Sequence, residues 1–456
     1  MLEIPGIFVR PIPRRRFLQI SGYSAVASLL NQSALGAAPL AGVNPIRACI
    51  LVMLYGGPSH LDTWDMKPGA PLEIRGDYRP MKTSVPGRFV CEHLPHCARV
   101  LDKLTVVRSM HHGMANHNSA MYQALVGRRP KVDLDVLGAH RAEDFPSFGS
   151  ALSYLTTTGE LPPTSSLLTN VALPHVMHNV VDLPGQNAGF LGGKYDPLQI
   201  THDPNLPDFH VPNLSLPLGV SAGRMSGRLR LLQSLQPKAA ETSVESVDQY
   251  HQRAVELLHS NSLQRAFRID QEAEQVRDRY GRNTLGQSLL LARKLVEADV
   301  RFINVNDKIY NGQDANWDSH ATLFPRHREL LAPFDQGFSA LIEDLADRGL
   351  LESTLVVVMG EFGRTPRVNS SGGRDHWPDC YSVVLAGGGV VPGGTYGESD
   401  RSGAYPAADA VTPGDLAATV FWRFGIDGRH EIHDSLGRPL PLAEGRPLQR
   451  LFPGAA

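Results

Sequence analysis

The chain has few cysteines and almost no net charge, and each shortage argues against a class of function. Only 4 of its 456 residues are cysteine, which disfavours zinc sites built from several thiolates. Lysine and arginine total 44 against 46 aspartate and glutamate residues, so no strong field attracts nucleic acid or an anionic membrane surface. Because 42% of the residues are hydrophobic, the chain can bury a large core and is not globally disordered.

Histidine, by contrast, is plentiful. The 18 histidines favour sites made of imidazole and carboxylate groups over thiolate sites. The stretch from Cys91 to Cys97, which contains His93 and His96, has a superficial likeness to a zinc knot. Its spacing matches no zinc finger and Pro95 interrupts it, so buried or surface thiols are the preferred interpretation.

The N-terminus carries the pattern of an export signal. Three arginines at positions 14–16 precede an uncharged stretch over residues 20–41, with small residues near Ala38. We expect residues 1–41 to be a twin-arginine leader and the mature protein to be periplasmic or extracellular. A membrane anchor is the alternative, although polar residues at 31–32 interrupt the stretch. No later segment approaches about 18 uninterrupted apolar residues, so we expect no further span.

Residues 42–456 are expected to form one α/β domain. Short apolar runs predict buried strands, and a helical repeat of apolar residues over 334–345 stands between two of them. Strands joined by helical crossovers predict a mostly parallel central sheet flanked by helices. The predicted strands cover residues 48–55, 104–108, 300–305, 354–359 and 382–386.

Residues 131–299 lie between the second and third predicted strands. The first part, to about residue 215, is rich in proline, glycine and asparagine, whereas residues 224–299 have a charged helical pattern. We interpret the region as an insertion of loops and helices that covers the strand ends, where open α/β sheets bind ligands. Lys194 and Tyr195 are candidates for closing over a substrate.

Polar clusters follow the first two predicted strands. His60 and Asp62 come directly after residues 48–55 and are candidate metal ligands or acid/base groups, unless Asp62 only caps a short helix. His117 and Ser119 stand at the start of a predicted helix, where unpaired N–H groups stabilise an anion. Simple helix capping is the alternative there too.

Two further clusters follow later strands. Asp318 and His320 are two residues apart and can share one ion from the same side of an extended segment. Glu361 and Arg364 follow residues 354–359, and His376 comes about fifteen residues after Glu361. A solvated loop explains any one cluster alone, but four clusters at one sheet edge support one another as a site.

The motifs in these clusters resemble those of a bacterial family, domain of unknown function 1501. The resemblance covers nearly the whole mature chain. It is carried by Gly-Gly-Pro-Ser-His60-Leu-Asp62-Thr-Trp-Asp65, Pro184-Gly-Gln-Asn-Ala-Gly-Phe-Leu-Gly192, Trp317-Asp-Ser-His320, Gly360-Glu-Phe-Gly-Arg-Thr-Pro366 and Gly-Arg-Asp-His376-Trp. The family is in turn similar to the alkaline phosphatase and sulfatase superfamily, through the stretch from Phe338 to Glu361.

This resemblance implies an exported, metal-dependent hydrolase of phosphate or sulfate esters. It implies that Asp318, His320 and His376 hold one divalent ion, with zinc the first choice. The substrate would be a small-molecule or polysaccharide ester. The alternative is a catalytically inactive member that binds an envelope polysaccharide or a protein partner.

A second, weaker metal site is implied at Glu361. The usual ligand after it is replaced by Phe362, and the usual aspartate at the end of the first strand is replaced by Tyr55. The resemblance therefore requires His60 or Asp62 to complete the second site.

The nucleophile departs furthest from the superfamily pattern. The position of the sulfatase formylglycine, ten residues before Gly127, holds His117, with Ser119 two residues further on. His117 would form a covalent phospho-enzyme, bind metal or mark a lost activity. Arg364 and the helix start at residues 116–119 are expected to neutralise the ester anion.

Overall fold

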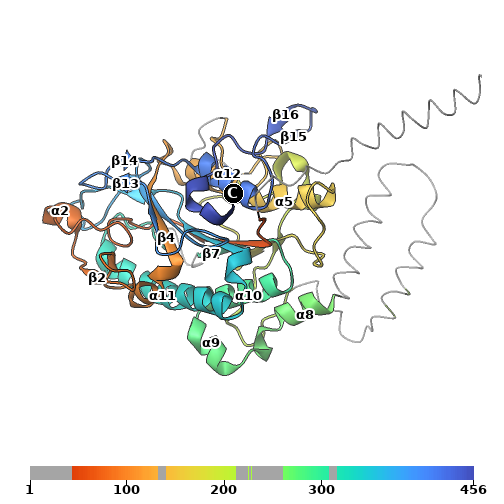
Figure 1. The fold of residues 1–456 in the computed structure, drawn as a ribbon, viewed down its shortest axis with the longest axis horizontal. Coiled ribbons are helices and arrows are strands. Elements are labelled where there is room, and N and C mark those ends of the chain that lie inside the picture. The colour runs from red at the N-terminus through yellow and green to blue at the C-terminus, as the bar shows by residue number, and fades with distance from the viewer. Residues whose placement is uncertain are drawn as a thin grey trace, which may run out of the picture.

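An eight-stranded sheet is the centre of the fold (Figure 1). The computed structural model describes residues 44–131, 140–211, 224, 227, 260–307 and 316–455, so the predicted leader lies outside the described residues. The strand order is β12-β4-β11-β8-β1-β7-β5-β6. The strands are β1 (Ala48–Leu54), β4 (Leu104–Met110), β5 (Asn170–Leu173), β6 (Leu198–Gln199), β7 (Phe302–Asp307), β8 (Thr354–Met359), β11 (Tyr381–Gly387) and β12 (Thr395–Tyr396).

Strand direction confirms the predicted mostly parallel α/β fold. β1 pairs in parallel with β7 and β8, and β5 does so with β6 and β7. β12 is parallel to β4, whereas β11 is antiparallel to both of its neighbours, β4 and β8. Every strand of this sheet except β11 therefore runs the same way, so β1, β4, β7 and β8 end at the same edge.

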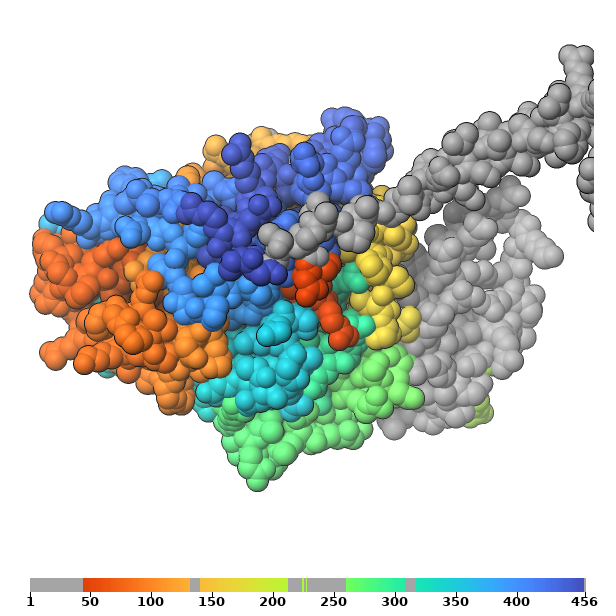
Figure 2. Space-filling model, viewed as in Figure 1, coloured from red at the N-terminus to blue at the C-terminus, as the bar shows by residue number. Residues whose placement is uncertain are grey.

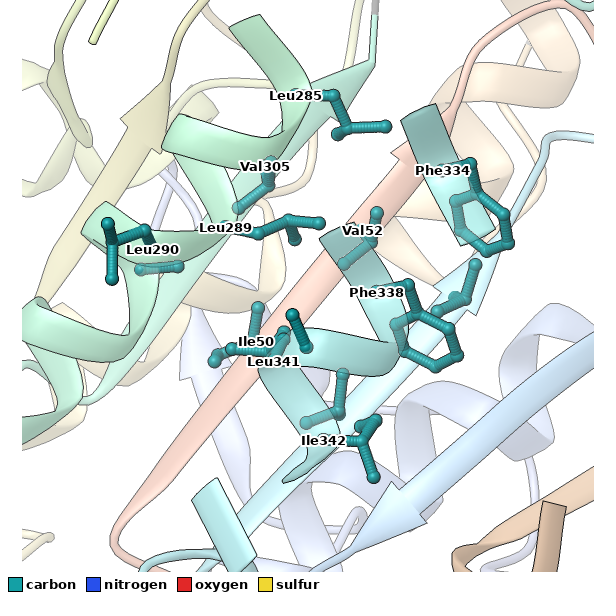
Figure 3. Close-up of a cluster of buried hydrophobic side chains, with 14 of the residues drawn as sticks. Ile50, Val52, Leu285, Leu289, Leu290, Val305, Phe334, Phe338, Leu341 and Ile342 are labelled. Carbon is teal, nitrogen blue, oxygen red and sulfur yellow. The ribbon is translucent and has the colours of Figure 1, made fainter. Parts of the chain in front are cut away.

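Two helical layers cover the sheet. Along β1, Ile50 and Val52 join the core on one face, whereas Cys49 and Leu51 join the core on the other, as the period of two in a strand requires. Figure 3 shows the core that contains Ile50 and Val52, where α10 and α11 pack on β1 and β7. The covering helices are α10 (Thr284–Glu297) and α11 (Leu323–Asp347) on that face, and α4 (His117–Val126), α5 (Phe148–Thr157) and α12 (Pro413–Arg423) on the other.

The region predicted as a covering insertion is partly integral to the fold. Its described residues supply β5 and β6 to the sheet and α10 to the core, so for these elements the prediction was wrong. Tyr195 is buried and contacts Tyr154 of α5, with 5.3 Å between ring centroids, and Lys194 lies over its ring. Tyr195 therefore packs against α5 and is not part of a lid.

Smaller elements complete the described chain. They are α2 (Leu72–Arg75), α3 (Pro95–Arg99), α8 (Asn261–Phe267), α9 (Glu274–Tyr280), β2 (Pro80–Lys82), β3 (Phe89–Cys91), β9 (Gly363–Arg364), β10 (His376–Trp377), β13 (Glu398–Ser399), β14 (Pro406–Ala408), β15 (Glu431–His433) and β16 (Pro439–Pro441). All four cysteines are buried free thiols, the preferred interpretation for Cys91 and Cys97. Among the described helices, none has the length and apolar character that crossing a bilayer requires.

Candidate metal centre

Imidazole and carboxylate groups converge at the edge where β1, β4, β7 and β8 end. One side-chain ligand atom each from His117, Asp318 and His376 lie within 4.8 Å of one another. His320 adjoins them, because its Nε2 lies 3.1 Å from Asp318 Oδ1 and 3.0 Å from His376 Nε2. Three histidines from three separate segments of the sequence thus surround a single carboxylate.

Backbone packing fixes Asp318. The preceding residue, Trp317, is buried; its indole N–H donates to Asp307 Oδ2 at 3.0 Å, and its backbone N–H donates to the carbonyl of Tyr55. Gly56 has a φ of +108°, and a Cβ there would lie 2.4 Å from the Asp318 nitrogen. The glycine that follows β1 therefore allows the Asp318 backbone to approach the sheet edge.

A short antiparallel ribbon brings two partners to the same carboxylate. β9 pairs with β10, so that Arg364 stands opposite His376. Arg364 Nη2 lies 2.5 Å from Asp318 Oδ1, and His376 Nε2 lies 3.1 Å from the same oxygen. The Arg364 side chain is fully buried and also donates to the carbonyls of Gly56, Gly57 and Arg374.

These contacts change the expected role of Arg364. Its N–H groups are directed at backbone carbonyls and at Asp318, and no part of the side chain is exposed to receive a substrate anion. The structure does not support the prediction that Arg364 neutralises the ester. Instead the guanidinium holds Asp318 in place and offsets its charge.

All three imidazole rings are anchored in the same way. Each Nδ1 lies beside an acceptor: His117 beside Glu361 Oε1 at 2.7 Å, His320 beside Asp375 Oδ1 at 2.8 Å, and His376 beside the carbonyl of Ala115 at 2.7 Å. A neutral ring that donates through Nδ1 has a lone pair on Nε2. Acceptors of this kind commonly fix the tautomer of metal-binding histidines.

The three Nε2 atoms all lie close to the Asp318 carboxylate. His320 Nε2 and His376 Nε2 are 3.0 Å apart and both lie 3.1 Å from Asp318 Oδ1. His117 Nε2 lies 3.2 Å from Asp318 Oδ2 but makes no well-aligned hydrogen bond. Lone pairs this close repel unless a proton or a cation lies among them, so the donor set fits a divalent ion, and nitrogen with oxygen ligands suits zinc.

Charge and burial define an inner and an outer side of the cluster. Burial lowers the pKa of His117, but its contacts with the Asp318 and Glu361 carboxylates outweigh this and raise the pKa to about 9. Burial raises the pKa of Asp318, yet its partners His117, His376 and Arg364 hold that pKa far below its usual value. Side-chain exposure rises from 10% for His117 to 20% for His376 and 47% for His320, so the cluster opens to solvent beside His320.

Aromatic rings form the inner wall. The ring of His117 lies between those of Tyr55 and Phe362, with centroids 5.3 and 5.0 Å away, and Phe362 also contacts His376 at 4.4 Å. The Phe362 ring occupies the space where a Cβ on Gly57 would stand, 2.5 Å away. Phe362, which stands where the resemblance implies a metal ligand, therefore closes the inner side with apolar surface.

His60 and Asp62 do not join the cluster, contrary to the prediction that one of them completes a second metal site. Asp62 is buried and accepts from Arg374 Nε at 2.7 Å, from Arg374 Nη2 at 3.2 Å and from Ser59 Oγ at 2.5 Å. His60 Nε2 lies 2.8 Å from the carbonyl of Gly403. Asp62 is therefore one half of a buried ion pair that ties the loop after β1 to the loop before β10.

Ser119 and Asn116, at the start of α4, lie outside the cluster of candidate ligands. Ser119 is buried in the first turn of α4 and is not part of the converging group. Asn116 caps α4, because its side chain accepts from the backbone N–H of Asn118, so capping explains part of that motif. Sequence reasoning missed Asp375 as the partner of His320; its position beside His376 in the quoted motif was the available signal.

The chain matches one protein family by sequence and aligns with several solved structures. A family model described as "Protein of unknown function (DUF1501)" matches residues 46–452. A search of curated proteins finds no match.

Several solved structures align with most of this chain at low sequence identity and low TM-score. The PsFucS1 sulfatase from Pseudoalteromonas sp. aligns at 13% identity over 91% of this chain and 72% of that chain, with a TM-score of 0.37. Phosphonate monoester hydrolase SpPMH from Silicibacter pomeroyi aligns at 10% identity over 90% and 76%, with a TM-score of 0.34. The C-terminal periplasmic domain of EcEptC from Escherichia coli, solved with Zn, aligns at 9% identity over 92% and 99%, with a TM-score of 0.38. Likeness this remote carries no information on activity.

Proposed function

We propose that this chain, which belongs to the DUF1501 family, is an exported metal-dependent hydrolase of phosphate or sulfate esters. The observation that carries the proposal is the convergence of three anchored imidazoles on Asp318 at the carboxyl edge of a mostly parallel sheet. Open α/β sheets bind ligands at this edge. Imidazole nitrogens and a carboxylate gathered this closely are also a donor set that suits a divalent ion.

The ligand set we propose is Asp318, His376, His320 and His117. A divalent ion held there would polarise the ester oxygens and lower the pKa of a bound water. Asp318 contributes the negative charge, Arg364 orients it, and Glu361, Asp375 and the Ala115 carbonyl orient the rings.

Access to the centre supports hydrolysis of an external ester. His320 is the most exposed of the four side chains, and Asp375 beside it is 55% exposed, so a substrate approaches from that side. The opposite side is closed by Phe362 and Tyr55, which exclude water from the inner face. One open side and one dry side fit a site that binds the charged end of a solvent-borne ester.

Turnover tests the activity. Purified protein is assayed with aryl phosphates and aryl sulfates, before and after chelation and with zinc restored. We expect hydrolysis that chelation abolishes and zinc restores, and that the double variant His320→Ala, His376→Ala lacks. The matched control removes two surface histidines, His178 and His202, and should retain wild-type turnover.

A non-catalytic binding protein is the second candidate. Phe362 in place of a ligand and His117 in place of a nucleophile favour it. Bound metal without turnover of either ester class would support this candidate and would contradict the proposed hydrolase.

Export is a separate part of the proposal and rests on the arginines at positions 14–16 and the uncharged stretch after them. Cell fractionation of the full chain should place it outside the cytoplasm. Replacing the three arginines with lysine should retain it inside, and unchanged export would contradict the twin-arginine route.

A further inference from the structure

Glu361 occupies the position where the superfamily resemblance implies a ligand of a second ion. In the structure, however, its carboxylate contacts protein donors. The side chain is fully buried. The backbone N–H of Gly56 donates to both of its oxygens, at 2.9 and 3.1 Å, and His117 Nδ1 lies 2.7 Å from Oε1. The carboxylate is therefore already bound on both oxygens by protein donors.

Glu361 belongs to no group of three or more converging metal ligands among the described residues. Phe362 fills the adjacent position, and Asp62 is committed to Arg374 and Ser59. The group of potential ligand atoms found among the described residues contains His117, Asp318 and His376 but not Glu361.

His117 is equally committed. Its Nδ1 faces Glu361 and its Nε2 faces Asp318 Oδ2 at 3.2 Å, so neither nitrogen points to open space where a substrate could be attacked. The ring also contacts the rings of Tyr55 and Phe362. His117 thus presents one nitrogen to the same carboxylate that His320 and His376 approach from its other oxygen.

We infer that the centre holds one ion per chain, that His117 is one of its ligands and not a nucleophile, and that Glu361 is a positioning residue for His117. This inference rests on the proposed metal centre and deepens it. In place of a second ion, the buried carboxylate fixes the tautomer and the angle of the imidazole. A consequence is that hydrolysis proceeds without a covalent enzyme intermediate. The oxygen of a water molecule bonds to the phosphorus or sulfur atom, the ester P–O or S–O bond breaks, and a proton from that water passes to the leaving oxygen to give the alcohol.

Cobalt titration tests the inference, because Co²⁺ reports both stoichiometry and ligand geometry by its visible absorption. Metal-free protein is titrated as wild type and as Glu361→Gln, Glu361→Met and His117→Ala. The wild type should bind one ion. Glutamine keeps an acceptor for Nδ1–H and should weaken binding by about 10-fold, whereas methionine removes it and should weaken binding by about 100-fold. His117→Ala should bind weakly and change the absorption spectrum.

Asp335→Asn is the matched control, because Asp335 is another buried carboxylate that accepts from backbone N–H groups, at His96 and Cys97. Its cobalt affinity should equal that of the wild type, and thermal melting shows whether each variant folds.

The titration distinguishes failure of this inference from failure of the proposed function. Two ions in the wild type and one in Glu361→Gln would overturn the inference, as would an unchanged spectrum in His117→Ala or equal affinity in all the Glu361 variants. No cobalt binding by the wild type would instead contradict the proposed function itself.

Discussion

At the scale of single residues, the centre depends on charges that are paired inside the protein. Asp318 is surrounded by Arg364 and three imidazoles, and the fully buried Arg364 is held by backbone carbonyls as well as by Asp318. Removing one member of such a pair leaves an uncompensated charge, which costs more than the pair contributes.

Replacing Arg364 with methionine should destabilise the metal-free protein. Asp318 would lose its closest cation, and three backbone carbonyls would lose a donor. We expect the free energy of unfolding to fall by about 3 kcal/mol, the lower end for a broken buried pair, because Asp318 is 18% exposed. Urea denaturation measures the loss. Arg367→Met, in the same loop but 77% exposed, should change stability by less than about 0.5 kcal/mol, and equal losses would contradict this role for Arg364.

The protonation of His117 makes the metal-free protein sensitive to pH. The pKa of His117 rises from its ordinary 6.5 to about 9 in the folded state, so the proton stabilises the fold fully below pH 6.5. That stabilisation, on the order of 3 kcal/mol, is lost as pH rises from 6.5 through 9. Urea denaturation of wild type and His117→Asn should show converging stability over this window, and parallel curves would contradict the assignment.

The same proton competes with the ion. Since Nε2 of His117 must be unprotonated to bind a metal, zinc affinity should increase between pH 6.5 and 9 in the wild type. The increase should be smaller in His117→Asn, which lacks the competing proton.

At the scale of elements, the ends of strands bring the site together. The loops after β1, β4 and β8 carry Gly56, His117 and Glu361, and the β9–β10 ribbon adds Arg364 and His376. Close backbone contacts contribute to the spacing between these loops.

A methyl group at Gly56 should disturb the centre through the Asp318 backbone, without changing the side chain of any ligand. Alanine there would be strained at a φ of +108° and would press on the Asp318 backbone. Gly87→Ala is the matched control, because Gly87 has a φ of +77° but nothing within 4 Å of a Cβ. We expect Gly87→Ala to cost about 1–2 kcal/mol of stability and leave zinc affinity unchanged. Gly56→Ala should cost more and weaken zinc binding at least about 10-fold by calorimetry; equal zinc affinity would contradict the packing argument.

The sequence predicts the elements better than their connections. All five predicted strands are present, because buried strands give short apolar runs bounded by turn residues. The reversed direction of β11 and the membership of β5 and β6 in the sheet follow from long-range pairing, which a local pattern does not contain. The two-residue β6 is too short to give a recognisable run.

The candidate site was predictable to a similar degree. Asp318, His320 and His376 stand in motifs with metal-ligand spacing, and the structure brings them together. The ion pair between Asp62 and Arg374 could not be predicted, because 312 residues separate the partners and both belong to motifs that otherwise indicate metal binding.

At the scale of the whole molecule, both faces of the sheet are packed in hydrophobic cores, and the candidate site lies at one edge of the sheet. The two hydrophobic cores lie on opposite faces of β1, and the helices in Figure 1 cover both faces. In the space-filling view the orange, cyan and blue segments, which are far apart in the sequence, pack against one another (Figure 2). A site on the edge of a sheet buried on both faces has its ligands fixed before any ion binds, which favours tight and selective binding.

The central claim is that Asp318 and the surrounding imidazoles hold a catalytic metal ion. Anomalous X-ray scattering at the zinc absorption edge, measured on crystals of the zinc-loaded protein, tests it most directly. We predict one strong peak in each chain, bounded by Asp318 and the Nε2 atoms of His117, His320 and His376. The absence of a peak there, or a peak centred on Glu361 or Asp62, would contradict it.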